Sequence, residues 1–184
     1  MSIDGKKIAI LVEADFEDEE LTKPLKTMEG AGVKITVIGG RPGTKYQGKR
    51  CRAEIASDIS ADKVEPDRFD AVIITGGYAP DKIRLHPAMI DLVKGMFDRG
   101  KLVSAVCHGP QLILSADIVK GKRVTSWPSV AIDLQNAGAK WSDEEVVIDG
   151  NLITSRKPAD LDAFSTAIIE TLGRYNGWTL IEIY

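Results

Sequence analysis

The chain has 184 residues, of which 43% are hydrophobic and 28% are charged, and its formal net charge is −3. This length suits one domain of roughly 150–200 residues with a substantial apolar core. The small negative charge leaves no basic footprint for nucleic acid, and no apolar run approaches the ~20 residues of a membrane span. The N-terminal sequence lacks the pattern of a signal peptide, so we expect a cytoplasmic protein without membrane attachment.

Cysteine and histidine are scarce in this sequence. There are two cysteines, Cys51 and Cys107, and two histidines, His86 and His108. Two cysteines cannot build a disulfide framework, and the lack of a secretion signal favours a reducing compartment. No cluster has the spacing of a metal site, so we expect neither a metal nor another cofactor. We assign no function to Cys51 and expect His86, which precedes Pro87, to be a surface or capping residue.

The first part of the chain predicts a βαβ unit. Residues 7–12 form a continuous apolar run, which is typical of a strand buried on both faces of a parallel sheet. The acidic stretch 13–20 leads into a helical pattern, in which Pro24 is expected either to introduce a kink or to mark the start of the regular helix. Residues 33–38 predict the second strand, and residues 44–60 predict short strands or a hairpin at a sheet edge.

The rest of the chain continues to alternate strands with helices. We expect strands at 71–75 and 102–106, helices over 87–99, 108–116, 127–137 and 158–175, and a hairpin formed by 146–148 and 152–155. This pattern predicts one domain over 1–184, an α/β fold with a doubly wound, mostly parallel, flavodoxin-like sheet and helices on both faces. The apolar tail within 174–184 is expected to dock on its own domain or on a neighbour.

Residues 101–114 are the most informative stretch. A short apolar strand runs directly into Cys107-His108-Gly109, and an apolar helical pattern begins at once. Backbone N–H groups and the helix dipole at such a junction stabilise anions, which favours a thiolate. The junction resembles a nucleophile elbow with cysteine in place of serine and predicts a cysteine-dependent enzyme. The alternative is a buried structural cysteine.

Three features follow predicted buried strands: Glu13, the Gly76-Gly77 pair and Cys107. If these strands are neighbours, the three features share one crevice. The backbone N–H groups of Gly77 and His108 could then form an oxyanion hole. Glu13 would touch the sulfur and remain protonated beside a thiolate.

The alternatives for two of these residues are open. Glu13 could instead be a solvent-exposed charge, because it belongs to a run of acidic residues. Only its position directly after the strand distinguishes it from the other acidic residues of this run. His108 would act as general acid or base, but adjacent helical side chains point ~100° apart, so the elbow or a partner must turn its imidazole toward the thiol. Otherwise His108 has an orienting or backbone role.

Taken together, these residues resemble the PfpI family of intracellular proteases and protein deglycases. This family belongs to the superfamily of the Parkinson-disease protein deglycase, and its fold is similar to that of class I glutamine amidotransferases. The similarity extends from about residue 6 to 172 and leaves out the tail at 174–184. It is carried by separate motifs in family order, at 13–21, 76–85, 106–111, 125–128 and 154–161.

The resemblance implies that Cys107 is the nucleophile and Glu13 its carboxyl partner. It also implies a homo-oligomer, a dimer or hexamer, in which an acid from a neighbouring subunit orients His108. That acid falls at Asp81, where the family usually has a longer glutamate. We expect Gly76 and Tyr78 to contact substrate; Tyr78 stands where the related motif often has arginine, which would alter binding of an anionic group.

The first functional hypothesis is a stress-protective enzyme that acts on small reactive carbonyls or glycated protein. Cys107 would attack methylglyoxal or its adducts, and hydrolysis would give a hydroxy acid, as in the glyoxalase III or deglycase chemistry that the resemblance implies. The first alternative is an intracellular cysteine peptidase. The second, of another class, is a redox sensor or chaperone in which Cys107 is oxidised to a sulfinic acid held by Glu13.

Overall fold

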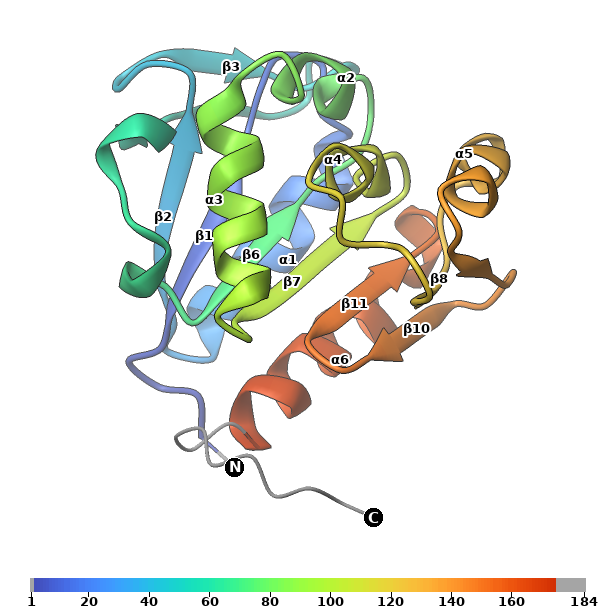
Figure 1. Cartoon of the computed structure of the whole chain (residues 1–184). Coiled ribbons are helices and arrows are strands. Elements are labelled where there is room, and N and C mark those ends of the chain that lie inside the picture. The colour runs from blue at the N-terminus through green and yellow to red at the C-terminus, as the bar shows by residue number, and fades with distance from the viewer. Residues whose placement is uncertain (1, 175–184) are drawn as a thin grey trace.

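The computed structural model describes residues 2–174. Its centre is a seven-stranded sheet in the order β10-β11-β7-β6-β1-β2-β5 (Figure 1). Every neighbouring pair is parallel except β10 and β11, which form the predicted antiparallel hairpin. The strands are β1 Lys7–Leu11, β2 Lys34–Gly39, β5 Ile59–Ser60, β6 Ala71–Ile74, β7 Leu102–Val106, β10 Val146–Asp149 and β11 Leu152–Ser155. The predicted doubly wound, mostly parallel sheet is confirmed.

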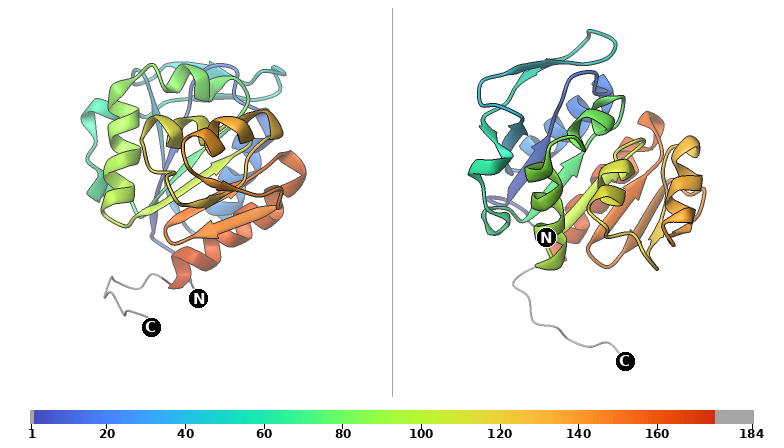
Figure 2. Two further views of the ribbon diagram at one scale, coloured as in Figure 1. Left: turned by 45° about the vertical axis from the view of Figure 1, so that its right-hand side comes forward. Right: turned by 45° about the horizontal axis from the view of Figure 1, so that its top comes forward.

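Helices cover both faces of this sheet. α1 and α6 pack together on one face, whereas α3 and α4 contact each other on the opposite face, with α2 beside α4 (Figures 1 and 2). The helices are α1 Asp18–Gly30, α2 Ala79–Ile83, α3 Pro87–Asp98, α4 Pro110–Ser115, α5 Ala131–Asn136 and α6 Leu161–Arg174. The central strands β6 and β7 are buried along their whole length, which explains their uninterrupted apolar character.

Several local details differ from the sequence-based expectations. α1 runs through Pro24, so a regular helix starting near this residue is wrong. Within 44–60, β3 (Lys45–Gln47) and β4 (Glu54–Ala56) form a separate antiparallel pair, while β5 is the edge strand of the main sheet. Short 3₁₀ turns at 128–130 and 158–160 open the helices expected there. The short α2 and the pair formed by β8 (Arg123–Val124) and β9 (Lys140–Trp141) were not predicted, because neither is long enough to show a period.

The segment that leaves β1 ties the β3–β4 hairpin to the carboxyl-terminal edge of the sheet. Phe16 forms isolated bridges with Gly48, at the start of the hairpin turn, and with Gly77, just after β6. The Asp15 N–H also donates to the Gln47 carbonyl oxygen at 2.8 Å. The turn between β3 and β4 therefore lies beside the ends of β1 and β6, and the hairpin stands out from the sheet there (Figure 2).

No helix among residues 2–174 combines the length and the apolarity that crossing a bilayer requires. The expected docking of the apolar tail concerns residues 175–184, which lie outside the described residues.

Candidate active site

Cys107 occupies a sharp elbow at the end of β7. Its φ of 61° lies in the left-handed region, which is strained for a residue with a side chain. Its N–H donates to the Ser155 carbonyl oxygen at 3.0 Å, and its carbonyl oxygen accepts from the Trp127 N–H at 2.9 Å. A Cβ added at Gly109 would lie 2.7 Å from the Ile74 carbonyl oxygen, so glycine lets the following turn pack against β6. The elbow predicted from the sequence is present in this form.

Glu20, from the buried face of α1, is the carboxyl group that meets the thiol. Its side chain interacts with that of Cys107, and its Oε2 accepts the Gly76 N–H at 2.8 Å. A Cβ added at Gly76 would lie 2.4 Å from this Oε2 and 2.7 Å from the Cys107 Cβ. Gly76 therefore lets the carboxyl and the thiol approach each other closely.

The expectation that Glu13 touches the sulfur is wrong. Its Oε1 accepts the N–H of Ala14, and its Oε2 lies 3.4 Å from His86 Nε2. Glu13 lies in the loop just after β1, outside the helix. A carboxylate reaches the end of the sheet only from α1, which begins at Asp18. The missed signal is helical spacing, because Glu20 shares the buried face of α1 with Leu21, Pro24 and Met28.

His108 is turned toward the thiol. Its Nδ1 lies 3.3 Å from Cys107 Sγ, and its ring stacks near Trp127 with the centroids 6.3 Å apart. Its Nε2 lies 3.4 Å from the hydroxyl oxygen of Ser129, a residue that the sequence analysis did not select. Asp81 is exposed on α2. Within one chain, the group facing the outer nitrogen of His108 is thus a hydroxyl.

Two backbone donors converge on the sulfur. The backbone N–H groups of Gly77 and His108 face the Cys107 thiol and lower its pKa. Gly77 has a φ of 76°, and a Cβ there would lie 2.4 Å from the backbone nitrogen of Glu17. The sequence predicts these same two donors, and the structure brings both to the thiol.

The thiol and carboxyl titrate as a coupled pair. Burial raises the pKa of Glu20 to about 7, and the charge of Glu17 adds to this, against the opposing effects of Cys107, the Gly76 N–H and Lys49. Burial and then a charged Glu20 raise the pKa of the Cys107 thiol, while the two backbone N–H groups lower it. Because two adjacent buried anions are unfavourable, the pair retains one proton above pH 7. Burial, with a contribution from Lys49, lowers the pKa of His108, so its imidazole is neutral there.

A pocket of about 270 Å³ opens onto these groups. Tyr78, Trp127 and Pro158 line it together with Cys107 and His108. The lining is completed by Gly77 and by the ionisable side chains of Glu17, Glu20, Lys49 and Arg50. Among residues 2–174, no cluster of three or more histidine, cysteine, aspartate or glutamate side chains could hold a metal ion. The pocket matches a small polar molecule better than an extended chain.

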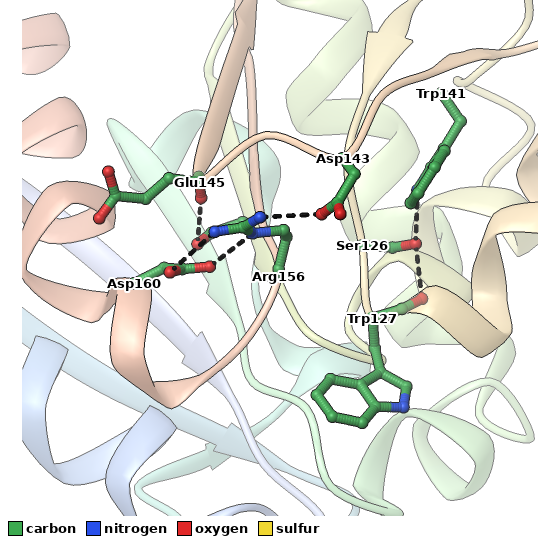
Figure 3. A network of polar contacts seen from close by, with 8 residues as sticks. Ser126, Trp127, Trp141, Asp143, Glu145, Arg156 and Asp160 are labelled. Carbon is green, nitrogen blue, oxygen red and sulfur yellow. Dashed lines mark hydrogen bonds and ion pairs between the residues drawn. The ribbon is translucent and has the colours of Figure 1, made fainter.

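Two polar networks lie next to the lining residues Trp127 and Pro158 in the sequence, and Figure 3 shows their hydrogen bonds and ion pairs. Trp141 Nε1 donates to Ser126 Oγ at 3.0 Å, and this hydroxyl donates to the Trp127 carbonyl oxygen at 2.9 Å. Arg156 donates to Asp160 and to Asp143, with closest distances of 2.9 and 2.8 Å. The second network braces the segment that contains Pro158. The motifs at 125–128 and 154–161 therefore each supply one lining residue and polar contacts that hold its segment in place.

Comparisons with known proteins identify the family to which this chain is similar. The model of the DJ-1/PfpI family matches residues 6–171. The chain is 40% identical over 170 residues to "Protein/nucleic acid deglycase 2" of Escherichia coli, covering 92% of this chain and 99% of that protein. It is 41% identical over 170 residues to "General stress protein 18" of Bacillus subtilis, covering 90% and 99%.

A solved structure gives the same result for the fold. DJ-1beta of Drosophila melanogaster superposes with a TM-score of 0.84 at 30% identity, covering 91% of this chain and 90% of that chain. The family model spans nearly the whole described region and includes every residue of the elbow. This chain belongs to the DJ-1/PfpI family.

Proposed function

We propose that this protein is a stress-protective, cysteine-dependent deglycase that acts on reactive α-oxoaldehydes and on their adducts with proteins. One observation carries the proposal: Cys107 meets a protonatable carboxyl, an imidazole and two backbone N–H groups in a small pocket. The names of the relatives from Escherichia coli and Bacillus subtilis support the reaction and the stress-protective role.

The first chemical step is addition of the Cys107 thiolate to the aldehyde carbon of methylglyoxal. A C–S bond forms, and the carbonyl π electrons become an alkoxide that the N–H groups of Gly77 and His108 stabilise. In the one-proton form of the pair, the Glu20 carboxylate takes up the thiol proton as the thiolate attacks and then returns this proton to the alkoxide. With an aminocarbinol adduct, the C–N bond breaks as the C–S bond forms, and the amine leaves with a proton.

The hemithioacetal then becomes a hydroxy acid without any external oxidant. Neutral His108 removes the proton from the former aldehyde carbon, and the resulting enediol takes a proton at the neighbouring carbon. The product is a thioester of lactate on Cys107. Water cleaves it, releasing lactate and the thiol, so methylglyoxal and one water give lactic acid. The lowered pKa of His108 suits this role, because the imidazole is available as a base at neutral pH.

We further propose that copies of the chain assemble as a homo-oligomer, a dimer or hexamer, in which Asp81 of one copy acts on His108 of another. The exposure of Asp81 on α2, the helix that follows Tyr78 of the pocket, supports this arrangement. Aspartate is a short acid, and the Ser129 hydroxyl beside His108 Nε2 would bridge the remaining distance.

The test is an assay of methylglyoxal loss and lactate formation with three proteins: wild type, Cys107→Ser and Cys51→Ser. Cys51 is the matched control, because it is a free, exposed cysteine outside the pocket. Lactate formed by wild type and Cys51→Ser but not by Cys107→Ser supports the proposal. Equal lactate from all three, or none from freshly reduced wild type, contradicts it.

The two alternatives have weaker support. A peptidase needs a groove for an extended chain, and a pocket of about 270 Å³ favours a smaller substrate. A redox sensor needs only a sulfinate held by a protonated carboxyl, which Glu20 rather than Glu13 would supply. Peptide hydrolysis, or a function gained on oxidation of Cys107 without carbonyl turnover, would favour one of these alternatives.

A further inference from the structure

The rim of the pocket carries two cations in a protein whose net charge is negative. Lys49 and Arg50 both line the pocket with Cys107, and both come from the turn between β3 and β4. The mechanism above uses neither of them. Two adjacent cations beside a nucleophile can bind an anionic group of a substrate through charge-assisted hydrogen bonds.

A buried carboxylate fixes the shape of this turn. Asp18, only 3% exposed, accepts the backbone N–H groups of Arg50, Arg52 and Ala53 at 2.8–3.0 Å. Burial alone would raise the pKa of Asp18, but these three hydrogen bonds hold it below its usual value, so the carboxylate stays charged. Gly48 packs directly on it, because a Cβ there would lie 2.3 Å from Oδ1. The two cations are therefore presented by a preorganised backbone.

Lys49 and Arg50 share the carboxylate of one neighbouring side chain, Glu17. Glu17, with its side chain 6% exposed, contacts Lys49 Nζ at 2.5 Å and Arg50 Nε at 3.2 Å. Burial favours loss of the Lys49 proton, but the ion pair with Glu17 raises its pKa, so Lys49 remains a cation. The single negative charge of the Cys107–Glu20 pair also acts on Lys49, so Arg50 is the less neutralised of the two cations. Arg50 uses Nε for this contact, which leaves its terminal nitrogens to a ligand, and its side chain is 56% exposed.

We infer that Lys49 and Arg50 form an anion subsite that selects α-oxoaldehydes bearing a carboxylate or phosphate at the end away from the aldehyde. The inference rests on the proposed function of Cys107. The Tyr78 ring, whose centroid lies 5.5 Å from Lys49 Nζ, packs against the cation. The aldehyde carbon would contact the Cys107 sulfur, and the anionic group at the other end of the substrate would displace water from the Lys49 and Arg50 side chains.

The probe is 4,5-dioxopentanoate, and its matched neutral control is 2-oxopentanal, which has the same chain length without the carboxylate. Hydration and rearrangement of the probe at Cys107 gives 2-hydroxyglutarate, with no external oxidant. We expect wild type to prefer the probe by about tenfold in kcat/KM, since each charge-assisted hydrogen bond contributes on this scale. Added salt should reduce the preference. A third substrate, 3-phosphooxy-2-oxopropanal, distinguishes phosphate from carboxylate as the favoured anion.

Lys49→Gln and Arg50→Gln should each lower the ratio of the two kcat/KM values toward one. The ratio is the readout, because any effect on the shared chemistry cancels in it. Arg52→Gln is the control: it removes the same charge from the same turn, outside the pocket lining, and keeps the backbone N–H that binds Asp18. Its ratio should equal that of wild type.

A binding measurement separates failure of the subsite from failure of the proposed reaction. Calorimetry of Cys107→Ser with 2-hydroxyglutarate and 2-hydroxypentanoate needs no turnover. Tighter binding of 2-hydroxyglutarate, lost on adding Arg50→Gln, supports the subsite even if neither aldehyde is consumed. A wild type that prefers 2-oxopentanal, or ratios that the Lys49 and Arg50 variants leave unchanged, overturns the inference.

Discussion

The hydroxyl oxygen of Ser129 lies 3.4 Å from His108 Nε2, on the far side of an imidazole whose Nδ1 is 3.3 Å from the Cys107 sulfur. If Nε2 carries the proton and donates a hydrogen bond to Ser129, the Nδ1 that faces the sulfur has no proton and is free to act as a base. A hydroxyl that holds this tautomer would favour His108 as a base. The sequence motif alone does not reveal this contact, which joins residues on two different elements.

Removing the Ser129 hydroxyl should therefore impair the base without changing substrate binding. We expect Ser129→Ala to lower kcat by about fivefold with little change in KM, because one modest hydrogen bond is lost. Ser129→Thr, which keeps the hydroxyl, should recover most of the rate. The relay to Asp81 predicts that Asp81→Ala has a similar effect and that the double variant is no worse than either single one. Additive losses would mean that the two side chains act independently.

Glu20 and Glu13 give a direct comparison between the carboxyl in the site and the one outside it. Glu20→Gln should reduce kcat/KM by about a hundredfold, because an amide cannot exchange a proton with the thiol. Glu13→Gln should leave turnover at the wild-type level, since Glu13 faces His86. A loss confined to Glu13→Gln would restore the original assignment and contradict the structure.

The pH dependence of turnover should report the Cys107–Glu20 pair. The pKa of Glu20 is raised to about 7, so the fully protonated pair loses its first proton near that pH. We expect kcat/KM to rise as the pH increases through about 7 and then to level off. In Glu20→Gln, kcat/KM should no longer rise near pH 7. A rise that persists unchanged in the variant would assign it to another group.

Burial of Glu20 also makes a prediction about stability. Its pKa is about 7 in the folded protein and near the ordinary value of 4.5 in the unfolded chain, so the folded state binds the proton more tightly. The stabilisation is present below pH 4.5 and is lost as the pH rises through 7. Wild type should therefore lose this stabilisation between pH 4 and pH 8, whereas Glu20→Gln should not. The free energy of unfolding of Glu20→Gln minus that of wild type should thus be about 2–3 kcal/mol larger at pH 8 than at pH 4. Urea unfolding at both pH values measures this difference, with Glu13→Gln as the reference.

Gly76 is a position where one methyl group should disrupt both folding and catalysis. In Gly76→Ala the new Cβ would meet Glu20 Oε2 and the Cys107 Cβ, both buried and closely packed. We expect a loss of about 2–4 kcal/mol of stability, together with most of the activity. Gly30→Ala is the matched control at the end of α1, where nothing lies within 4 Å of an added Cβ. Equal effects of the two substitutions would contradict the close approach at Gly76.

The sequence predicts the parallel sheet and the elbow well because both are local patterns. An uninterrupted apolar run predicts each central strand, and the Cys107-His108-Gly109 turn follows one of them directly. Gly77 was predicted as a donor to the site for the same reason. The prediction of Glu13 as the carboxyl partner is wrong because it rests on the position of Glu13 directly after β1. The helical periodicity of α1 instead places Glu20 on the buried face.

The contacts that the sequence could not predict join residues far apart in the chain. Ser129 reaches His108 from a 3₁₀ turn, and Asp18 fixes a turn more than thirty residues further on. Each of these depends on how the hairpin and the helices dock, which no local pattern encodes. The exposed fraction of Asp18 is likewise a property of the assembled fold, since a carboxylate in an acidic run is usually solvated.

The left-handed backbone at Cys107 has a consequence for how this protein can change. A side chain there costs about 1–2 kcal/mol that glycine would not. Cys107→Gly should therefore relieve strain at the elbow while removing the thiol. Selection for expression or thermal stability alone would favour variants that have lost Cys107. A screen for more stable variants must therefore also select for turnover.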